Sequence, residues 1–583
     1  MGGFMRLLRT VIAAVVLASS FSASSRAQRI EMSVPAATGP LHGHVVLVIT
    51  KKDKPEPRLQ MTENYLSAQG FGVDVDGLAP GKPIVVDEAT FGYPIRSLKD
   101  LQAGDYFVQA VFNVYEEFRL ASGKIVWLPP DKGEGQKWNA KPGNFYNEPV
   151  KMHWDAKAGA TAAAAATVKL ELDKVIPPIE GTDEDPTVIA AKDPAAKWLK
   201  YMRFKSEKLS AFWGRDVYLG AWVLLPDGFD EHPDARYPLI VYQDHYQARF
   251  GPSFVATKPE VGGSGGRRGG DSGYRLYQDW TSGRLPRAIV LYVQNANQYY
   301  DDSYAVDSAN VGPYGAAINE ELIPVVEKMY RGIGQGWARA TFGGSTGGWE
   351  ALATQVFYPD MYNGAFVACP DPVDFHAYQN INLYDYNNAF SLKGDFGEVP
   401  IAADRKPDGT VIADTAGEFA YEYVLGTHGR STEQWDIWQA VFSPAGRDGY
   451  PAEILDPLTG EIDQQVLAYW HDHYDLTAMM KRDWPTLGPK LEGKLHLAVG
   501  DGDTYFLNNA VHRLQKELEA TRNPHSDANF QYGPGMPHCY TGGPPEYTMQ
   551  KNNADWAQRV LPLMVEHMLA TAPAGADVKS WRY

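Results

Sequence analysis

The chain has 583 residues, of which 44% are hydrophobic, 21% charged and 12% aromatic. This length predicts two to four domains with enough material for a large core, and the mixed composition excludes a disordered or fibrous chain. The net charge of −17 disfavours nucleic-acid binding, because an acidic protein repels phosphate backbones. The two cysteines are too few for a disulfide-dense scaffold or a four-cysteine metal site.

Residues 1–27 have the pattern of a secretory signal peptide. Arg6 and Arg9 precede the apolar run 10–21, and Ala27 closes a stretch of small residues. The run is shorter than the ~20 residues that a bilayer span needs, and no later stretch is long and apolar enough. We therefore expect an exported protein, secreted or periplasmic, with no membrane span.

Residues 28–178 are rich in short β-type segments separated by Gly and Pro. These segments lie at 44–50, 82–86, 105–115, 124–128 and 167–172. The spacing predicts an all-β, sandwich-like N-terminal domain over 28–178. Residues 179–204 begin with an acidic, turn-rich stretch and are expected to form a linker.

Residues 205–583 alternate strand and helix patterns, which predicts an α/β domain with a mainly parallel sheet. Strands are expected at 217–225, 237–242, 288–293, 339–343, 364–369, 494–499 and 529–532, and helices at 319–330, 346–357 and 555–569. The stretch from about 371 to 488 contains no obvious buried strand. We interpret it as an insertion over one end of the sheet.

Two serines match the pattern G-x-S-x-G. Ser264 lies in a Gly-rich loop with no strand before it and no helix after it. Ser345 follows the strand pattern 338–342 and precedes a helical pattern, which is the setting of a nucleophile elbow. This context selects Ser345 as the candidate nucleophile.

A serine nucleophile needs a base and an acid that orients the base. His538 lies in a Gly/Pro loop directly after the last expected strand. Asp503 follows the strand 494–499, and Asp501 is the alternative acid. The chain order Ser, Asp, His is typical of α/β-hydrolases.

Further residues are candidates for contacting the substrate. The backbone amide of Thr346 is expected to bind an oxyanion, and a second donor is expected near His245 or Tyr246. Aromatic side chains that could line the cleft are Tyr299, Tyr300 and Trp349.

The catalytic half resembles the putative esterase family of α/β-hydrolases, which includes feruloyl, acetylxylan and siderophore esterases and mycolyl transferases. The matching segments are YPLIVYQDHY (237–246), 312–330, FGGSTGGWEAL (342–352), 498–503 and GPGMPHC (533–539). The resemblance implies hydrolysis of carboxylic esters through an acyl-enzyme, without cofactor or metal. The expected substrates are small-molecule or polysaccharide-linked esters, carbohydrate esters among them. The region before 205 and the insertion lie outside the family pattern.

Cys369 follows the strand after the elbow, and Cys539 follows the candidate base. Because the only two cysteines of an exported protein often pair, we predict a disulfide that ties the histidine loop to the sheet. Two other functions remain open: an acyltransferase with the same triad, and a non-catalytic binding protein with this fold. A peptidase is disfavoured because no propeller repeat precedes the catalytic half. The sequence leaves the natural acyl group and the oligomeric state undetermined.

Overall fold

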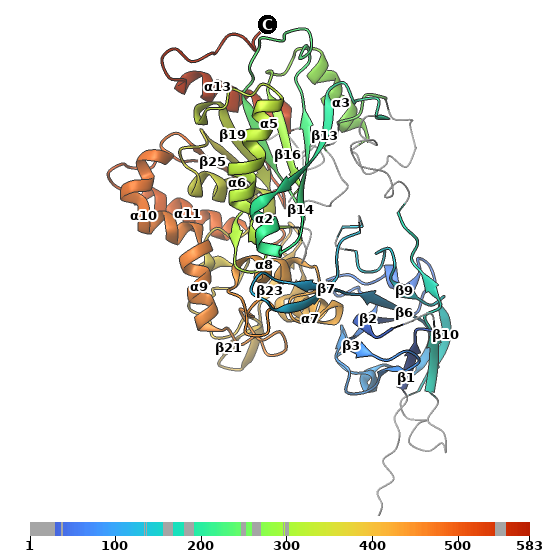
Figure 1. The fold of residues 1–583 in the computed structure, drawn as a ribbon. Coiled ribbons are helices and arrows are strands. Elements are labelled where there is room, and N and C mark those ends of the chain that lie inside the picture. The colour runs from blue at the N-terminus through green and yellow to red at the C-terminus, as the bar shows by residue number, and fades with distance from the viewer. Residues whose placement is uncertain are drawn as a thin grey trace, which may run out of the picture.

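The structure is a computed structural model that describes residues 29–35, 39–132, 134–135, 137–155, 167–179, 192–245, 252, 254–258, 270–294, 297, 302–542 and 556–583. The expected signal peptide, the acidic part of the linker and the loop with Ser264 lie outside these residues. Among the described helices, none has both the length and the apolar composition to cross a bilayer. The β-rich N-terminal region lies at the lower right of Figure 1, below a larger α/β region.

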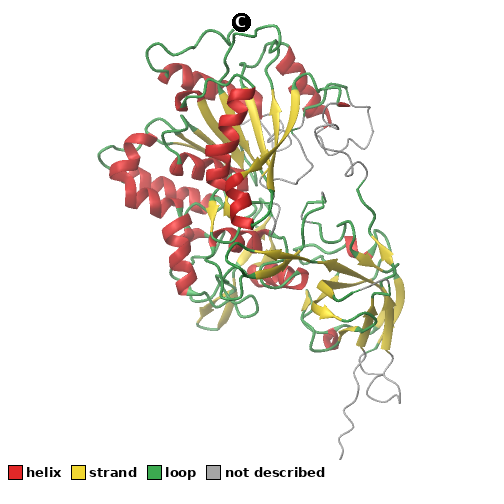
Figure 2. Cartoon of the chain, viewed as in Figure 1, coloured by secondary structure: helices red, strands yellow, loops and turns green. Residues whose placement is uncertain are grey.

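The N-terminal region contains two sheets and a hairpin (Figure 2). The smaller sheet has the order β11 (Thr167–Glu171), β1 (Arg29–Ser33), β4 (Ile84–Val86). The larger, antiparallel sheet has the order β12 (Lys174–Val175), β9 (Phe145–Tyr146), β6 (Gly104–Val114), β2 (Leu41–Thr50), β3 (Gln69–Leu78), β5 (Gly92–Tyr93), with β10 (Val150–Trp154) also paired to β6. The hairpin pairs β7 (Glu116–Arg119) with β8 (Ile125–Leu128), and short 3₁₀ turns lie at η1 (Pro57–Leu59) and η2 (Leu98–Asp100).

Strand β2 is buried on both faces, which explains its continuous apolar sequence. Successive side chains of a strand point to opposite faces. Val45 and Leu47 enter a core shared with the smaller sheet, whereas Val46 and Val48 pack against residues of the later insertion, including Val424. The β-rich N-terminal region is thus confirmed, and its description as a sandwich stays a prediction.

The larger region is built on an eight-stranded sheet. Its order is β13 (Leu199–Ser206), β14 (Val217–Leu224), β16 (Ile289–Gln294), β15 (Leu239–Gln243), β19 (Arg339–Gly344), β20 (Ala365–Ala368), β25 (Leu495–Gly500), β26 (Asn529–Gly533). The first two pairs are antiparallel and every later pair is parallel. The α/β character is therefore confirmed. The edge strand β13 begins at Leu199, inside the expected linker. Its sequence LKYMRFKS mixes Lys and Arg with apolar residues, so it lacks the continuous apolar run that identifies the buried strands.

Helices accompany this sheet along the chain. They are α2 (Glu207–Trp213), α3 (Gly270–Thr281), α4 (Tyr314–Ala316), α5 (Ile323–Met329), α6 (Thr346–Phe357), α10 (Leu476–Leu491), α11 (Asn508–Glu519), α12 (Trp556–Arg559) and α13 (Leu561–Thr571). A π-helical turn, η4 (Ala317–Leu322), joins α4 to α5, and the remaining short elements are β17 (Asp307–Ser308), β18 (Gly312–Pro313), η5 (Gly336–Ala338) and η6 (Phe375–Ala377). Helix α6 follows Ser345 and is buried along nearly its whole length, so it is a rigid support for that residue.

The insertion consists of two small hairpins and three helices before α10. The elements are β21 (Ser391–Gly394), β22 (Gly397–Pro400), β23 (Ala402–Arg405), β24 (Val411–Asp414), α7 (Thr415–Leu425), α8 (Gln434–Phe442) and α9 (Gln464–Tyr474). Helix α7 contacts β2, β3 and β5 of the N-terminal sheet, and α7 and α8 lie between the two regions in Figure 1. The insertion thus connects the N-terminal sheet to the α/β region.

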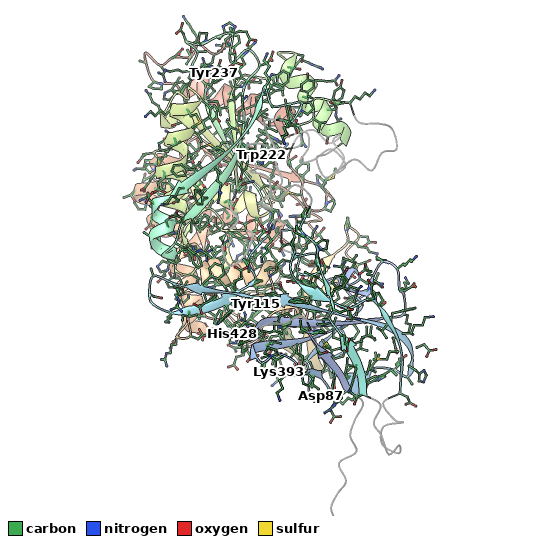
Figure 3. The ribbon with its side chains drawn as sticks, turned by 45° about the vertical axis from the view of Figure 1, so that its right-hand side comes forward. Asp87, Tyr115, Trp222, Tyr237, Lys393 and His428 are labelled. Atoms are coloured by element: carbon green, nitrogen blue, oxygen red, sulfur yellow. A yellow bond between two sulfur atoms is a disulfide. The ribbon has the colours of Figure 1, made fainter. Side chains whose placement is uncertain are left out.

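A polar cluster reinforces this contact. Buried His44 on β2 is 2.8 Å from Asp74 on β3 through Nδ1 and 2.8 Å from the carbonyl of Val424 on α7 through Nε2. Arg430 of the insertion lies 3.3 Å from Asp74, and its guanidinium is 4.9 Å from the ring centroid of Tyr115. Figure 3 labels Tyr115 in this part of the molecule. Burial opposes ionisation of Asp74, but hydrogen bonding to His44 and the nearby positive charges hold its pKa below the usual range.

Candidate active site

Ser345 lies at a sharp turn between β19 and α6. Its φ of 59° and ψ of −126° belong to a sparsely populated region that costs on the order of 1–3 kcal/mol. The turn also requires glycine nearby. A Cβ on Gly343 would lie 2.0 Å from the carbonyl oxygen of Gly347, and a Cβ on Gly347 would lie 2.2 Å from that of Gln243. The strand–turn–helix setting predicted for Ser345 is what the structure contains.

The three side chains predicted from the sequence form one hydrogen-bonded chain. The Ser345 hydroxyl donates to Nε2 of His538 over 2.9 Å, and Nδ1 of His538 donates to Asp503 over 2.9 Å. Asp503 is fully buried, and its other oxygen accepts from the amides of Tyr505 and Leu507 at 3.0 and 3.2 Å. The alternative acid Asp501 is 44% exposed and lies 3.6 Å from His512. The structure therefore places Asp503 beside the histidine.

Cys369 and Cys539 form the predicted disulfide, with their Cα atoms 5.2 Å apart. Cys369 directly follows β20, and Cys539 directly follows His538. The Ser345 amide donates to the carbonyl of Ala368 at 3.1 Å and approaches Sγ of Cys369 at 3.3 Å. The bridge therefore fixes the histidine loop to the strand end that also supports Ser345.

Thr346 is the first residue of α6, so its amide lies where the helix dipole favours a negative charge. Its side chain is also engaged: Oγ1 is 2.8 Å from Nε2 of His245 and donates to Asp371 over 2.9 Å. His245, two residues after the end of β15, thus lies at the site as predicted. The predicted Tyr246 lies outside the described residues.

Asp371 is a site residue that the sequence analysis missed. Its carboxylate is buried and accepts from Tyr304 at 2.6 Å and from Trp438 at 3.3 Å, and the Ser345 hydroxyl lies 3.5 Å away. Burial raises its pKa, while hydrogen bonding to Tyr304 and the nearness of His245 oppose the rise. A usable signal was present, because Asp371 lies just beyond the carboxyl end of the strand next to the elbow.

Ser345 and His538 open into a cavity of about 320 Å³. It is lined by Glu63, His245, Ser345, Asp371, Gln379, Glu418, Tyr421, Glu422, Glu433, Gln434, Trp435, Trp438, Tyr505, Leu507 and His538. Most of these residues come from the insertion, and Glu63 comes from the N-terminal region. The insertion and the N-terminal region therefore shape the space next to the serine.

Of the three aromatic residues predicted to contact the substrate, the structure describes only Trp349. Trp349 is fully buried on α6, where its ring packs against Tyr304 and Phe442, so it belongs to the core and does not line the cavity. Phe442 belongs to the insertion, which thus covers the face of α6 that carries Trp349. Tyr299 and Tyr300 lie outside the described residues. The aromatic residues that do line the cavity come from α7, α8 and the loop after β25.

Comparison with known proteins confirms the family resemblance. Residues 217–448 match the model of a family described as "Putative esterase", and this segment contains Ser345. No curated protein matches the chain.

Similar solved structures include a ferulic acid esterase, with 15% identity, a TM-score of 0.34 and coverage of 64% of this chain and 99% of that chain. An S-formylglutathione hydrolase from Agrobacterium tumefaciens has 9% identity and a TM-score of 0.31, with coverage of 64% and 94%. FphF, a fluorophosphonate-binding serine hydrolase from Staphylococcus aureus, has 13% identity and a TM-score of 0.32, with coverage of 64% and 98%.

Proposed function

We propose that this protein is an exported serine hydrolase that cleaves carboxylic esters through an acyl-enzyme. The observation that carries the proposal is the hydrogen-bonded chain from Ser345 through His538 to Asp503, with both bonds at 2.9 Å. It lies at the elbow of a segment that matches an esterase family. A hydroxyl aligned on an imidazole whose other nitrogen is held by a buried carboxylate is the arrangement that activates serine.

In the acylation step, Nε2 of His538 accepts the hydroxyl proton while Ser345 Oγ attacks the ester carbonyl. The tetrahedral intermediate collapses, the bond to the alcohol oxygen breaks, and His538 returns the proton to the departing alcohol. Water then attacks the acyl-enzyme with the same base, which releases the acid and restores Ser345. Asp503 holds the imidazole in the tautomer that presents Nε2 as the acceptor.

The amide of Thr346 provides one oxyanion donor, since it lies at the N-terminus of α6 next to Ser345. The second donor comes from the backbone near His245. The side chains of His245 and Asp371 hold the Thr346 hydroxyl at 2.8 and 2.9 Å, so they act as positioning residues for the turn that carries the oxyanion amide.

Steady-state hydrolysis of an ester panel tests this proposal. The panel comprises 4-nitrophenyl acetate and butyrate, methyl ferulate and acetylated xylose, compared in wild type and Ser345→Ala. We expect wild-type turnover of at least one ester and a loss of about 10³-fold or more in kcat in the variant. Equal activity in both proteins, or none in either, would contradict the proposal.

The same assay with an added alcohol separates hydrolysis from acyl transfer. The acceptor is methanol at about 1 M, which is about 2% of the concentration of water. A hydrolase should release free acid at nearly the same rate with and without the methanol. Formation of the new ester as the main product would assign the site to an acyltransferase.

A further inference from the structure

Carboxyl groups from three separate segments line the cavity that contains Ser345. Glu63 comes from the loop before β3, Glu418 from α7, and Glu433 from the residue that precedes α8. No lysine or arginine is among the described residues that line it. Several carboxyl groups with no lysine or arginine among them therefore lie beside the reacting serine.

These carboxyl groups repel one another. Burial raises the pKa of Glu433 to about 8, and the charge of Glu63 adds to the rise. Burial also raises the pKa of Glu418, with further contributions from Asp404 and Glu63. The same neighbour, Glu63, thus acts on both groups. A positive charge placed among them would relieve this repulsion and stabilise their ionised forms.

An independent feature of the cavity also indicates a missing hydrogen-bond donor. Gln379 lines the cavity with a side chain that is 4% exposed, and its Oε1 has no hydrogen-bond partner within the part of the chain that the structure describes. A buried acceptor left unpaired destabilises the folded protein, so a bound ligand with N–H or O–H groups would remove that cost.

Aromatic side chains also line the cavity. Tyr421, Trp435, Trp438 and Tyr505 line the same cavity, and Nε1 of Trp435 donates to Glu418 over 3.1 Å. Carboxylates combined with tryptophan and tyrosine rings bind organic cations, since both attract positive charge. Two further acids of the cavity already have partners and are left out of the binding set. Glu422 accepts from the amides of Trp435 and Asp436, both at 2.9 Å, and so caps α8, while Asp371 accepts from the hydroxyls of Tyr304 and Thr346.

The spacing of the carboxylates favours an organic cation over a metal ion. A calcium site needs six to eight oxygen ligands at roughly 2.3–2.6 Å. Among described residues, the one cluster with three metal-type ligand atoms within 4.8 Å of one another is Cys369, His538 and Cys539, and its two sulfurs are joined in the disulfide. The acids of the cavity do not converge in that way. A neutral sugar could pair with Gln379 but would leave the repulsion among the acids unrelieved.

We propose that Glu63, Glu418, Glu433 and Gln379 bind a primary ammonium group, so that the enzyme acts on esters whose acyl or alcohol part carries a protonated amine. The inference rests on the proposed function, because it assigns a substrate class to the same cavity. The three hydrogens of the ammonium go to Gln379, Glu418 and Glu433, Glu63 acts on it through its charge alone, and the aromatic rings cover its aliphatic carbons. A quaternary ammonium lacks these hydrogens and binds less tightly.

Isothermal titration calorimetry tests the inference without any turnover. The titrants are n-butylammonium, n-butanol, tetramethylammonium, calcium chloride and methyl xyloside. We expect n-butylammonium to bind wild type with one site and about tenfold or more tighter than n-butanol or tetramethylammonium. Equal binding of n-butanol, or binding of calcium or methyl xyloside without binding of n-butylammonium, would overturn it.

Charge-neutralising variants locate the site. Glu433→Gln and Glu418→Gln should each weaken n-butylammonium binding by about tenfold or more. The matched control is Glu453→Gln, which removes another acid of the insertion whose pKa burial raises to about 7 but which does not line this cavity. Unchanged binding in both Glu433→Gln and Glu418→Gln contradicts the inference. If one of these variants does not fold, the other alone provides the test.

The two proposals fail in different ways. Hydrolysis of the neutral esters without binding of n-butylammonium contradicts only the ammonium site. Binding of n-butylammonium by a protein that hydrolyses no ester contradicts only the proposed function. Competitive inhibition of 4-nitrophenyl butyrate hydrolysis by n-butylammonium, absent with n-butanol, would support both together.

Discussion

Asp503 is the residue whose placement decides how His538 functions. It is fully buried, one oxygen accepts from His538, and the other accepts from the two backbone amides of Tyr505 and Leu507. These bonds fix the carboxylate before any substrate binds. The adjacent Asp501 is partly exposed and lies beside His512. The two acids, two residues apart, therefore have different roles.

Asp503→Asn should lower kcat for ester hydrolysis by about 10³–10⁴-fold while leaving the fold intact. The amide can donate to Nδ1 of His538 and so favours the tautomer whose Nε2 carries the proton and cannot accept from Ser345. Steady-state kinetics of the variant measure the loss. Asp501→Asn is the matched control and should retain wild-type kcat; a larger loss in the control than in Asp503→Asn would reverse the assignment.

The residues that the sequence could predict are those whose role follows from local context. Ser345, Asp503 and His538 each lie at the carboxyl end of a strand, and a loop after a strand can be recognised from its own residues. Asp371 was missed because its contacts, to Tyr304 and Trp438, bring together segments far apart in the chain. The prediction that Trp349 lines the cleft is wrong, because nothing near Trp349 in the sequence shows that the insertion covers it.

At the scale of elements, the disulfide joins the end of β20 to the loop after β26. The cysteines are separated by 170 residues, so the bridge closes a long loop that includes the insertion. A cross-link of this kind stabilises the native state mainly by restricting the unfolded chain. It also holds His538, which is adjacent to Cys539.

The double variant Cys369→Ser/Cys539→Ser should lower the free energy of unfolding by roughly 2–5 kcal/mol. Because the histidine loop loses its attachment, kcat should fall more than KM changes. Urea unfolding and steady-state kinetics measure the two effects, and wild type with a reducing agent should reproduce both. A variant with unchanged stability and unchanged kcat would show that the bridge is dispensable.

Strand β25 contains a second testable feature, His496, whose ring stacks on Phe366 at 4.3 Å. Burial lowers its pKa to about 4, and nearby His567 adds to the effect. In the unfolded chain its pKa is about 6.5, so between these values the unfolded state binds the proton more strongly. Stability should therefore fall as the pH decreases through this window.

Between pH 7 and pH 5, His496 should account for a loss of about 2 kcal/mol in the free energy of unfolding. His496→Phe keeps the aromatic stack and removes the titration, so urea unfolding at the two pH values should show a correspondingly smaller difference. His525→Phe, at an exposed histidine, is the control and should leave the difference unchanged. The same pH dependence in His496→Phe as in wild type would contradict this assignment.

At the scale of the whole molecule, the insertion connects the N-terminal sheet to the serine. Its helix α7 packs on β2, β3 and β5, while residues of α7 and α8 line the cavity. The α/β and all-β regions could be predicted from their strand patterns. The contact between the two regions could not be predicted. It depends on alternate residues of β2 that pack against α7, and the sequence of β2 alone is that of any buried strand.

Arg430→Met should destabilise the protein by about 1.5–3 kcal/mol, because it removes the buried guanidinium from the Asp74 carboxylate, which keeps its hydrogen bond to His44. Urea unfolding measures the change. The matched control is Lys481→Met, which breaks an exposed pair with Glu517 at 2.9 Å and should cost at most about 1 kcal/mol. Similar losses in both variants would show that the contact between the N-terminal sheet and the insertion contributes no more than a surface ion pair.

Covalent labelling is the most direct test of whether Ser345 is the activated nucleophile of an ester-hydrolysing site. Wild type is treated with a fluorophosphonate probe, digested and analysed by peptide mass spectrometry. We expect a single adduct on the peptide that contains Ser345, absent in Ser345→Ala and strongly reduced in His538→Ala. No adduct on wild type, or an adduct on another serine such as Ser264 that persists in Ser345→Ala, would contradict this role of Ser345.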